Sequence, residues 1–143
     1  QPIFVGVGGG TTTGSRVVEL AMMAEMQGAA GVVLNAPASA ETVESTMAVI
    51  DIPVMATVLA DDEDVDNKIM AGAAILNVAA GARTAEVVAS IRARHPEMPI
   101  VASGGKTGES ILATVAAGAD AVSWTPPSAQ DLQHAMMNRY REG

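Results

Sequence analysis

The residue types of an anion-binding turn follow one another at Ser103, Gly104, Gly105, Lys106 and Thr107. They come after a short apolar run and before a segment with helical periodicity, so we expect free backbone N–H groups at a helix N-terminus. Such groups favour a negative charge, and the Lys106 ammonium adds to the attraction. The turn predicts a phosphate or carboxylate site; the alternative is an ordinary glycine turn with a solvated lysine.

A second loop, near the start of the chain, is rich in glycine and hydroxyl groups, and its residues are Gly8, Gly9, Gly10, Thr11 and Thr12. It lies near the P-loop pattern, but Ser15 and Arg16 stand where that pattern has its lysine. It also begins like a dinucleotide-binding fingerprint, with Thr11 in place of the third glycine. Neither phosphate motif is complete, so we expect the loop to bind a ligand through N–H and hydroxyl groups.

The densest run of charge is acidic and comprises Asp61, Asp62, Glu63, Asp64 and Asp66. Carboxylates at the end of a strand can hold Mg²⁺. Acids equally suit the first turn of a helix, where they meet the positive end of the dipole. Asp61 and Asp62 are therefore the candidates for a general base or metal ligand, with Mg²⁺ as the suggested cofactor, and the alternative is a simple helix start.

Apolar runs bounded by glycine and proline alternate with segments of helical periodicity along the chain. The runs predict strands at 2–7, 31–35, 53–59, 74–78, 100–102 and 121–124, each followed by a helix. Consecutive strand–helix units imply parallel strands with right-handed crossovers. Ligands bind at the carboxyl ends of such strands, which adds the candidates Asn35, Asn77, Trp124 and Thr125.

A longer repeat spans two strand–helix units, because alternate strands begin at Pro2, Pro53 and Pro99. The spacing predicts a single domain of three βαβα modules, at about 1–50, 51–96 and 97–143. A (β/α)8 barrel holds four such modules. The expected fold class is α/β: a TIM barrel that is incomplete or completed by another subunit, or alternatively an open, doubly wound, six-stranded parallel sheet.

Composition narrows the class of partner. The 16 acidic and 8 basic residues give a formal charge of −8, which argues against nucleic acid or an anionic membrane. A small anionic metabolite would need a locally basic site or backbone N–H groups.

Aromatic residues are only 2%, so small aliphatic side chains and methionine must form the core. The absence of cysteine and of a span-length apolar run fits a cytoplasmic protein, and the open edges of a partial barrel favour a homo-oligomer.

Two segments resemble known barrel families. Residues 103–105, with the helix that ends at 117–120 (AGAD) and the short last strand, resemble the seventh and eighth units of phosphate-binding TIM barrels. Imidazole glycerol phosphate synthase, phosphosugar aldolases and epimerases, and inosine monophosphate dehydrogenase share that pattern. Residues 5–9 and 31–37 are similar to the third and fourth units of the dihydrodipicolinate synthase and N-acetylneuraminate lyase aldolases. Both resemblances agree in register, so the chain would hold units three to eight.

The resemblance implies a lyase or isomerase that acts on a small phosphorylated or carboxylated metabolite. Residues 103–106 would hold the anion, and residues 9–12 would orient a carbonyl or carboxylate. Schiff-base aldolases need a lysine on a strand, whereas Lys68 falls in mid-helix and Lys106, the third catalytic candidate beside Asp61 and Asp62, falls in a turn. Pro126 and Pro127 stand where the phosphate site often has another glycine. The alternatives are a ligand-sensing barrel that resembles the glycerol-phosphate antiterminator regulators, and an FMN-binding oxidoreductase.

Overall fold

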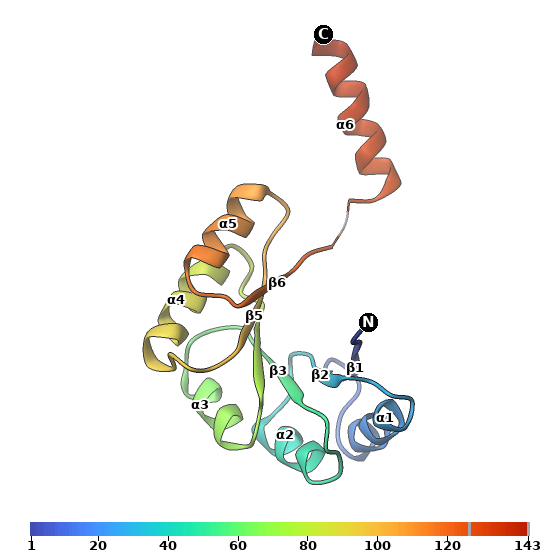
Figure 1. Ribbon diagram of the computed structural model, residues 1–143, viewed down its shortest axis with the longest axis vertical. Helices are drawn as coiled ribbons and strands as arrows, with labels where there is room; N and C mark the ends of the chain where they lie inside the picture. Colours follow the sequence, from blue (N-terminus) through green and yellow to red (C-terminus); the bar gives the residue numbers. More distant parts are fainter. Residues whose placement is uncertain (126, 143) are drawn as a thin grey trace.

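The computed structural model describes residues 1–125 and 127–142, and within them six parallel strands form one curled sheet (Figure 1). The spatial order of the strands follows their order in the sequence. The strands are β1 (Phe4–Gly8), β2 (Gly31–Leu34), β3 (Val54–Val58), β4 (Ile75–Val78), β5 (Ile100–Ser103) and β6 (Ala121–Ser123).

A helix follows every strand, and α1 to α5 cover the outer side of the curled sheet (Figure 1). The last helix, α6, projects away from the sheet, and all of its described side chains are exposed. The helices are α1 (Ser15–Met26), α2 (Ala40–Met47), α3 (Glu63–Met70), α4 (Thr84–Arg94), α5 (Gly108–Ala116) and α6 (Ala129–Glu142), with a short 3₁₀ helix, η1 (Gly81–Arg83), before α4. None of the described helices is both long and apolar enough to cross a membrane.

The strand order confirms the incomplete TIM barrel. Each strand pairs in parallel with the next one along the chain, as Val32 does with Val54 and Leu76 with Ile100. A doubly wound sheet reverses its strand order at a switch point and carries helices on both faces. The order β1 to β6 has no such reversal, so the alternative of an open doubly wound sheet is wrong.

Aliphatic side chains fill the space between the sheet and its helices. They form two clusters, one beneath α1 and α2 with Leu34 at its centre and one beneath α3 and α4 with Leu76 and Ile91. Such a core needs no large aromatic ring, in agreement with the composition. Alternate strand residues face the other way, and on that inner face Asn77 Nδ2 donates a hydrogen bond to Thr57 Oγ1 at 3.0 Å.

Hydroxyl and acidic residues just before segments of helical periodicity predict N-caps at Ser39, Asp61, Thr84 and Thr107, and the structure confirms two of the four. Ser39 and Thr107 cap α2 and α5, as predicted, because each side-chain oxygen accepts a backbone N–H in the first turn. Asp62, not Asp61, caps α3, since its carboxylate accepts the Asp64 N–H at 3.0 Å. Thr84 is not a cap but the first residue of α4, because η1 occupies the preceding turn.

The helical spacing of Ile111, Leu112, Val115 and Ala116 predicts one apolar face on α5, but this face is only partly buried. Leu112 and Val115 are 70% and 50% exposed, whereas Thr114 is buried. The predicted face mixed residues that point toward the sheet with residues that point along the outer surface, which the 3.6-residue period separates poorly over such a short helix.

Two leucines test where the core lies. Replacing Leu76 by alanine should lower the free energy of unfolding by about 2 to 5 kcal/mol, because the side chain is fully buried and leaves a cavity. The same change at Leu112, which is 70% exposed, should alter it by less than about 0.5 kcal/mol. Urea unfolding of both variants, followed by circular dichroism, measures the difference. Equal losses would show that the core has been placed wrongly.

Candidate functional site

The carboxyl ends of all six strands lie along one rim of the sheet, because parallel pairing gives every strand the same direction. This rim collects the glycine loop after β1, Asn35 after β2, the acidic run after β3 and the lysine-containing turn after β5. Asn77 lies one residue before the end of β4, and Trp124 and Thr125 follow β6. The structure thus places every predicted site residue at or beside the same rim.

The turn between β5 and α5 is tightly constrained. A Cβ atom on Gly104 would lie 2.2 Å from a methyl carbon of Val122, so only glycine fits there. Gly105 has a φ of +77°, a conformation that glycine adopts without strain. Ser110 Oγ accepts the Thr107 N–H at 3.3 Å, and Thr107 Oγ1 accepts the Ser110 N–H at 3.1 Å. These contacts hold the turn in one shape at the N-terminus of α5.

Two donors in this turn are left for a ligand. Among the described residues, neither the Gly105 nor the Lys106 backbone N–H has a hydrogen-bond acceptor. Both residues are exposed. The Lys106 charge also reaches Asp131 on α6, whose pKa is held below its ordinary value by hydrogen bonds from Ser128 and, to a smaller extent, by Lys106. The turn can therefore offer an anion two N–H groups and one ammonium.

A cavity of about 640 Å³ opens above the ends of β1, β2 and β3. One wall is the glycine loop, in which the Gly9 N–H donates to the Thr12 carbonyl at 3.1 Å. Gly9 has a φ of +102°, and a Cβ atom there would lie 2.2 Å from the Asn35 carbonyl oxygen, so glycine is required. The lining residues are Gly9, Thr12, Thr13, Ala36, Pro37, Ala38, Ser39, Thr42, Thr57, Leu59, Ala60, Asp62, Asp64 and Lys68.

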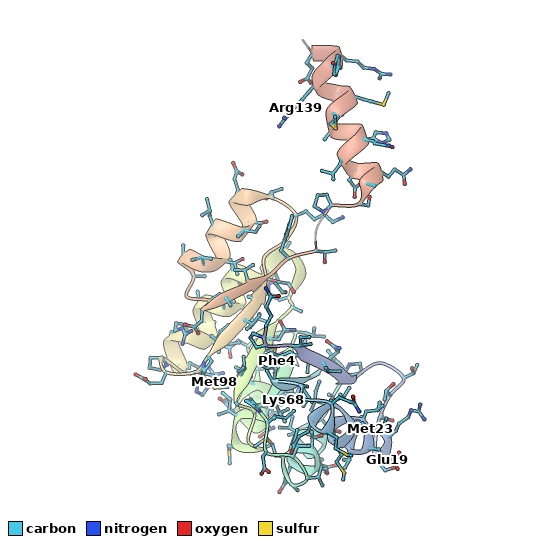
Figure 2. All side chains as sticks on the ribbon, turned by 45° about the vertical axis from the view of Figure 1, so that its right-hand side comes forward. Phe4, Glu19, Met23, Lys68, Met98 and Arg139 are labelled. Atoms are coloured by element: carbon cyan, nitrogen blue, oxygen red, sulfur yellow. The ribbon has the colours of Figure 1, made fainter. Side chains whose placement is uncertain are left out.

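Lys68 is the residue of this cavity that sequence reasoning missed. It lies in mid-helix, as predicted, but its side chain is only 4% exposed and reaches from α3 to β3 (labelled in Figure 2). Its Nζ donates to the Thr57 carbonyl at 3.1 Å and pairs with Asp64 Oδ2 at 2.6 Å. The helical spacing could have identified Lys68, because it shares with Val65 and Ile69 the face of α3 that meets the sheet.

Asp61 lies outside the cavity and is bound to α4. Its carboxylate accepts hydrogen bonds from Arg94 and Ser90, and Arg94 also binds Asp66 at 2.9 Å. His95 Nε2 lies 2.8 Å from Asp66 Oδ1. The Arg94 hydrogen bond holds the pKa of Asp61 below its ordinary value, despite an opposing effect of burial. A carboxylate held ionised in this way is a weak base, so the geometry disfavours the predicted base role for Asp61.

The remaining predicted residues divide between two parts of the rim. Gly9, Thr12 and Asp62 line the cavity, whereas Ser103, Gly104, Gly105 and Lys106 form the turn at β5. Gly8, Gly10, Thr11 and Asn35 adjoin the cavity along the chain but do not line it. Trp124 and Thr125 are exposed. Pro126, expected to weaken the phosphate site, lies outside the described residues. The ligand-binding role of every residue stays a prediction.

Comparison with known proteins shows the fold. No family model matches the sequence, and no curated protein matches it significantly. A tyrosine-to-phenylalanine variant of mandelate oxidase with a monooxide FMN adduct has a TM-score of 0.74 and 22% identity, over 86% of this chain and 48% of that one. Mandelate oxidase with benzoyl-formic acid has a TM-score of 0.68 and 22% identity, over 77% of this chain and 45% of that one. The chain thus spans about half the length of these barrels.

The comparison corrects the cofactor prediction and narrows the resemblance. The prediction of Mg²⁺ as the cofactor was wrong, because the first of these solved structures holds an FMN adduct. The described residues also contain no group of three or more His, Cys, Asp or Glu side chains that could hold a metal ion. The partial barrel is confirmed, but no aldolase, lyase or isomerase appears among the reported structures. At this identity the likeness establishes a partial TIM barrel and leaves the activity open.

The contacts of Arg94 predict a pH dependence of stability. The pKa of Asp61 and of Asp66 is lower in the folded chain than the ordinary value of 3.8. Their stabilising effect is therefore complete above the unfolded pKa and is lost as the pH falls through the lower folded values. Urea unfolding at pH 7 should show Arg94→Met less stable than the unchanged chain, and the gap should narrow as the pH falls below the ordinary carboxyl pKa of 3.8 and through the lower folded values. Arg16→Met, at an exposed position on α1, should show no such pH-dependent gap. A gap that persists unchanged at low pH would contradict the assignment.

Proposed function

We propose that this chain forms the phosphate-binding part of an FMN-dependent TIM-barrel oxidoreductase, with the turn between β5 and α5 as the phosphate site. The observation that carries the proposal is the pair of unused N–H groups at Gly105 and Lys106, on the rim of a partial barrel. The fold likeness to a barrel that holds an FMN adduct supports FMN over other phosphorylated ligands. An oxidoreductase therefore replaces the lyase or isomerase as the main functional hypothesis.

The residues of the turn fit a phosphate group. Phosphates bind where backbone N–H groups converge at a helix N-terminus, and α5 begins directly after this turn with its first turn capped by Thr107. Gly104 is buried against Val122 of β6 and donates its N–H to the Ser123 carbonyl, so it anchors the turn, whereas Gly105 and Lys106 stay exposed. Lys106 supplies a positive charge at this turn, which an anion needs in a chain with a formal charge of −8.

Bound FMN would supply two-electron redox chemistry, which no side chain of this protein provides on its own. The role of this chain would be to bind the cofactor and fix its orientation. Gly105 and Lys106 would hold the phosphate, and Asn77 and Ser103, polar side chains of the inner sheet face on β4 and β5, are the candidates to contact the rest of the cofactor. The hydrogen bond to Thr57 already fixes the orientation of the Asn77 side chain.

Titration with FMN tests the proposal without any assay of turnover. Trp124 is the only tryptophan and follows β6, the strand beside the turn. Added FMN should quench its fluorescence with a saturable curve. Lys106→Met should weaken FMN binding by about tenfold, equivalent to about 1.4 kcal/mol, because one charge-assisted contact is lost.

Arg139→Met is the matched control, because Arg139 also carries one positive charge but lies on the projecting helix α6 (Figure 2). It should leave FMN affinity unchanged. Riboflavin, which lacks the phosphate, should bind more weakly than FMN, and inorganic phosphate should compete with FMN. Equal affinity for riboflavin and FMN would reject the phosphate site, and an unquenched tryptophan with no change in the flavin spectrum would reject FMN binding altogether.

A further inference from the structure

We propose that the cavity above β1, β2 and β3 is a separate binding site for a short-chain monocarboxylate, with Lys68 as the group that receives the carboxylate. None of the residues that line the cavity belongs to β5, β6 or the turn between β5 and α5. The inference therefore does not depend on FMN binding. It rests on the buried ammonium, the shape and lining of the cavity, and the unequal exposure of Lys68 and its partner.

The cavity has the size and surface of a small-molecule site. Its volume of about 640 Å³ falls within the range of pockets that enclose small organic ligands, about 300 to 1,000 Å³. Apolar side chains, including Pro37, Leu59 and Ala60, form part of the wall. Thr12 and Thr13, from the loop after β1, add hydroxyl groups to the lining. A molecule with a short apolar body and one polar end matches this mixed lining.

Lys68 provides the polar end with a donor. An ammonium group has three N–H donors, and the described residues supply acceptors for two: the Thr57 carbonyl at 3.1 Å and Asp64 Oδ2 at 2.6 Å. The third donor has no acceptor among the described residues, although Lys68 lines the cavity. A buried charge is costly unless its hydrogen bonds are complete, so the site gains most from an acceptor that carries negative charge.

The ion pair can open on one side only. Lys68 is 4% exposed and tied to the strand backbone at Thr57, whereas the Asp64 side chain is 48% exposed and lies one helical turn away. Asp64 can therefore turn into solvent at little cost, while the Lys68 ammonium must stay where it is. An incoming carboxylate would take the place of the Asp64 carboxylate on Lys68. Asp64 acts in this scheme as an internal competitor.

Charge explains why affinity in the unchanged chain should be modest. Asp62 and Asp64 both line the cavity beside the single cation Lys68, so the lining carries a net charge of −1 (two carboxylates and one ammonium). Removing the charge of Asp64 should make the site neutral and free the ammonium. The proposal thus predicts that a substitution strengthens binding, which a merely structural ion pair would not do.

Calorimetric or ligand-observed NMR titration of the full chain with butyrate tests this prediction, with butyramide as the uncharged probe of the same shape. Asp64→Asn should tighten butyrate binding by about fivefold to tenfold, since it removes a competing charge next to the site. Lys68→Met should weaken butyrate binding by at least about tenfold, as expected for the loss of a charge-assisted hydrogen bond. Butyramide should bind more weakly than butyrate and respond little to either change.

Arg139→Met, which removes one positive charge from the projecting helix α6, is the control and should leave butyrate binding unchanged. Asp64→Asn retains Lys68 and the cap from Asp62, so the proposal remains testable even if Lys68→Met does not fold. Unchanged or weaker butyrate binding in Asp64→Asn would overturn it, as would equal binding of butyrate and butyramide. If FMN does not bind but the variants change butyrate binding as predicted, the proposed function is rejected and the carboxylate site stands.

Discussion

The parallel hydrogen bonding of six strands in sequence order is the constraint on which the structure depends. It requires each connection to cross back over the sheet, which puts α1 to α5 on one side and the aliphatic core beneath them. It also places all loops that leave a strand at one rim, while the returning loops lie at the other. The direction of the strands alone therefore decides which rim can bind a ligand and which rim only carries connecting loops.

Within that frame, Lys68 is the most unusual feature of the core. A lysine on the sheet-facing side of α3 replaces an aliphatic residue that the packing would otherwise accept. Removing one partner of a buried charge pair is destabilising, yet replacing the whole pair by apolar groups is often neutral or favourable. Stability therefore explains the ammonium at this position poorly. A ligand-binding role explains it better, because Lys68 lines an open cavity.

Most of the framework could be predicted from the sequence, because local signals determine it. The six strands, their parallel direction, and the caps Ser39 and Thr107 follow from apolar runs, glycine turns and hydroxyl residues. The grouping of the candidate residues at one rim follows from topology. What the sequence could not show depends on contacts between elements far apart in the chain. Asp61 meets Arg94 on α4, and Lys68 reaches back to Thr57, and neither pairing has a periodic signature.

The two outermost strands have a consequence of their own. Among the described residues β1 and β6 each pair with one neighbour, so the outer side of each presents bare backbone donors and acceptors. Phe4 and Val5 on β1 are 39% and 36% exposed, which adds apolar surface to that border. An extended segment of almost any sequence can join such a border through main-chain bonds. Concentrated preparations should consequently be prone to self-association, and a barrel-closing polypeptide would protect both borders at once.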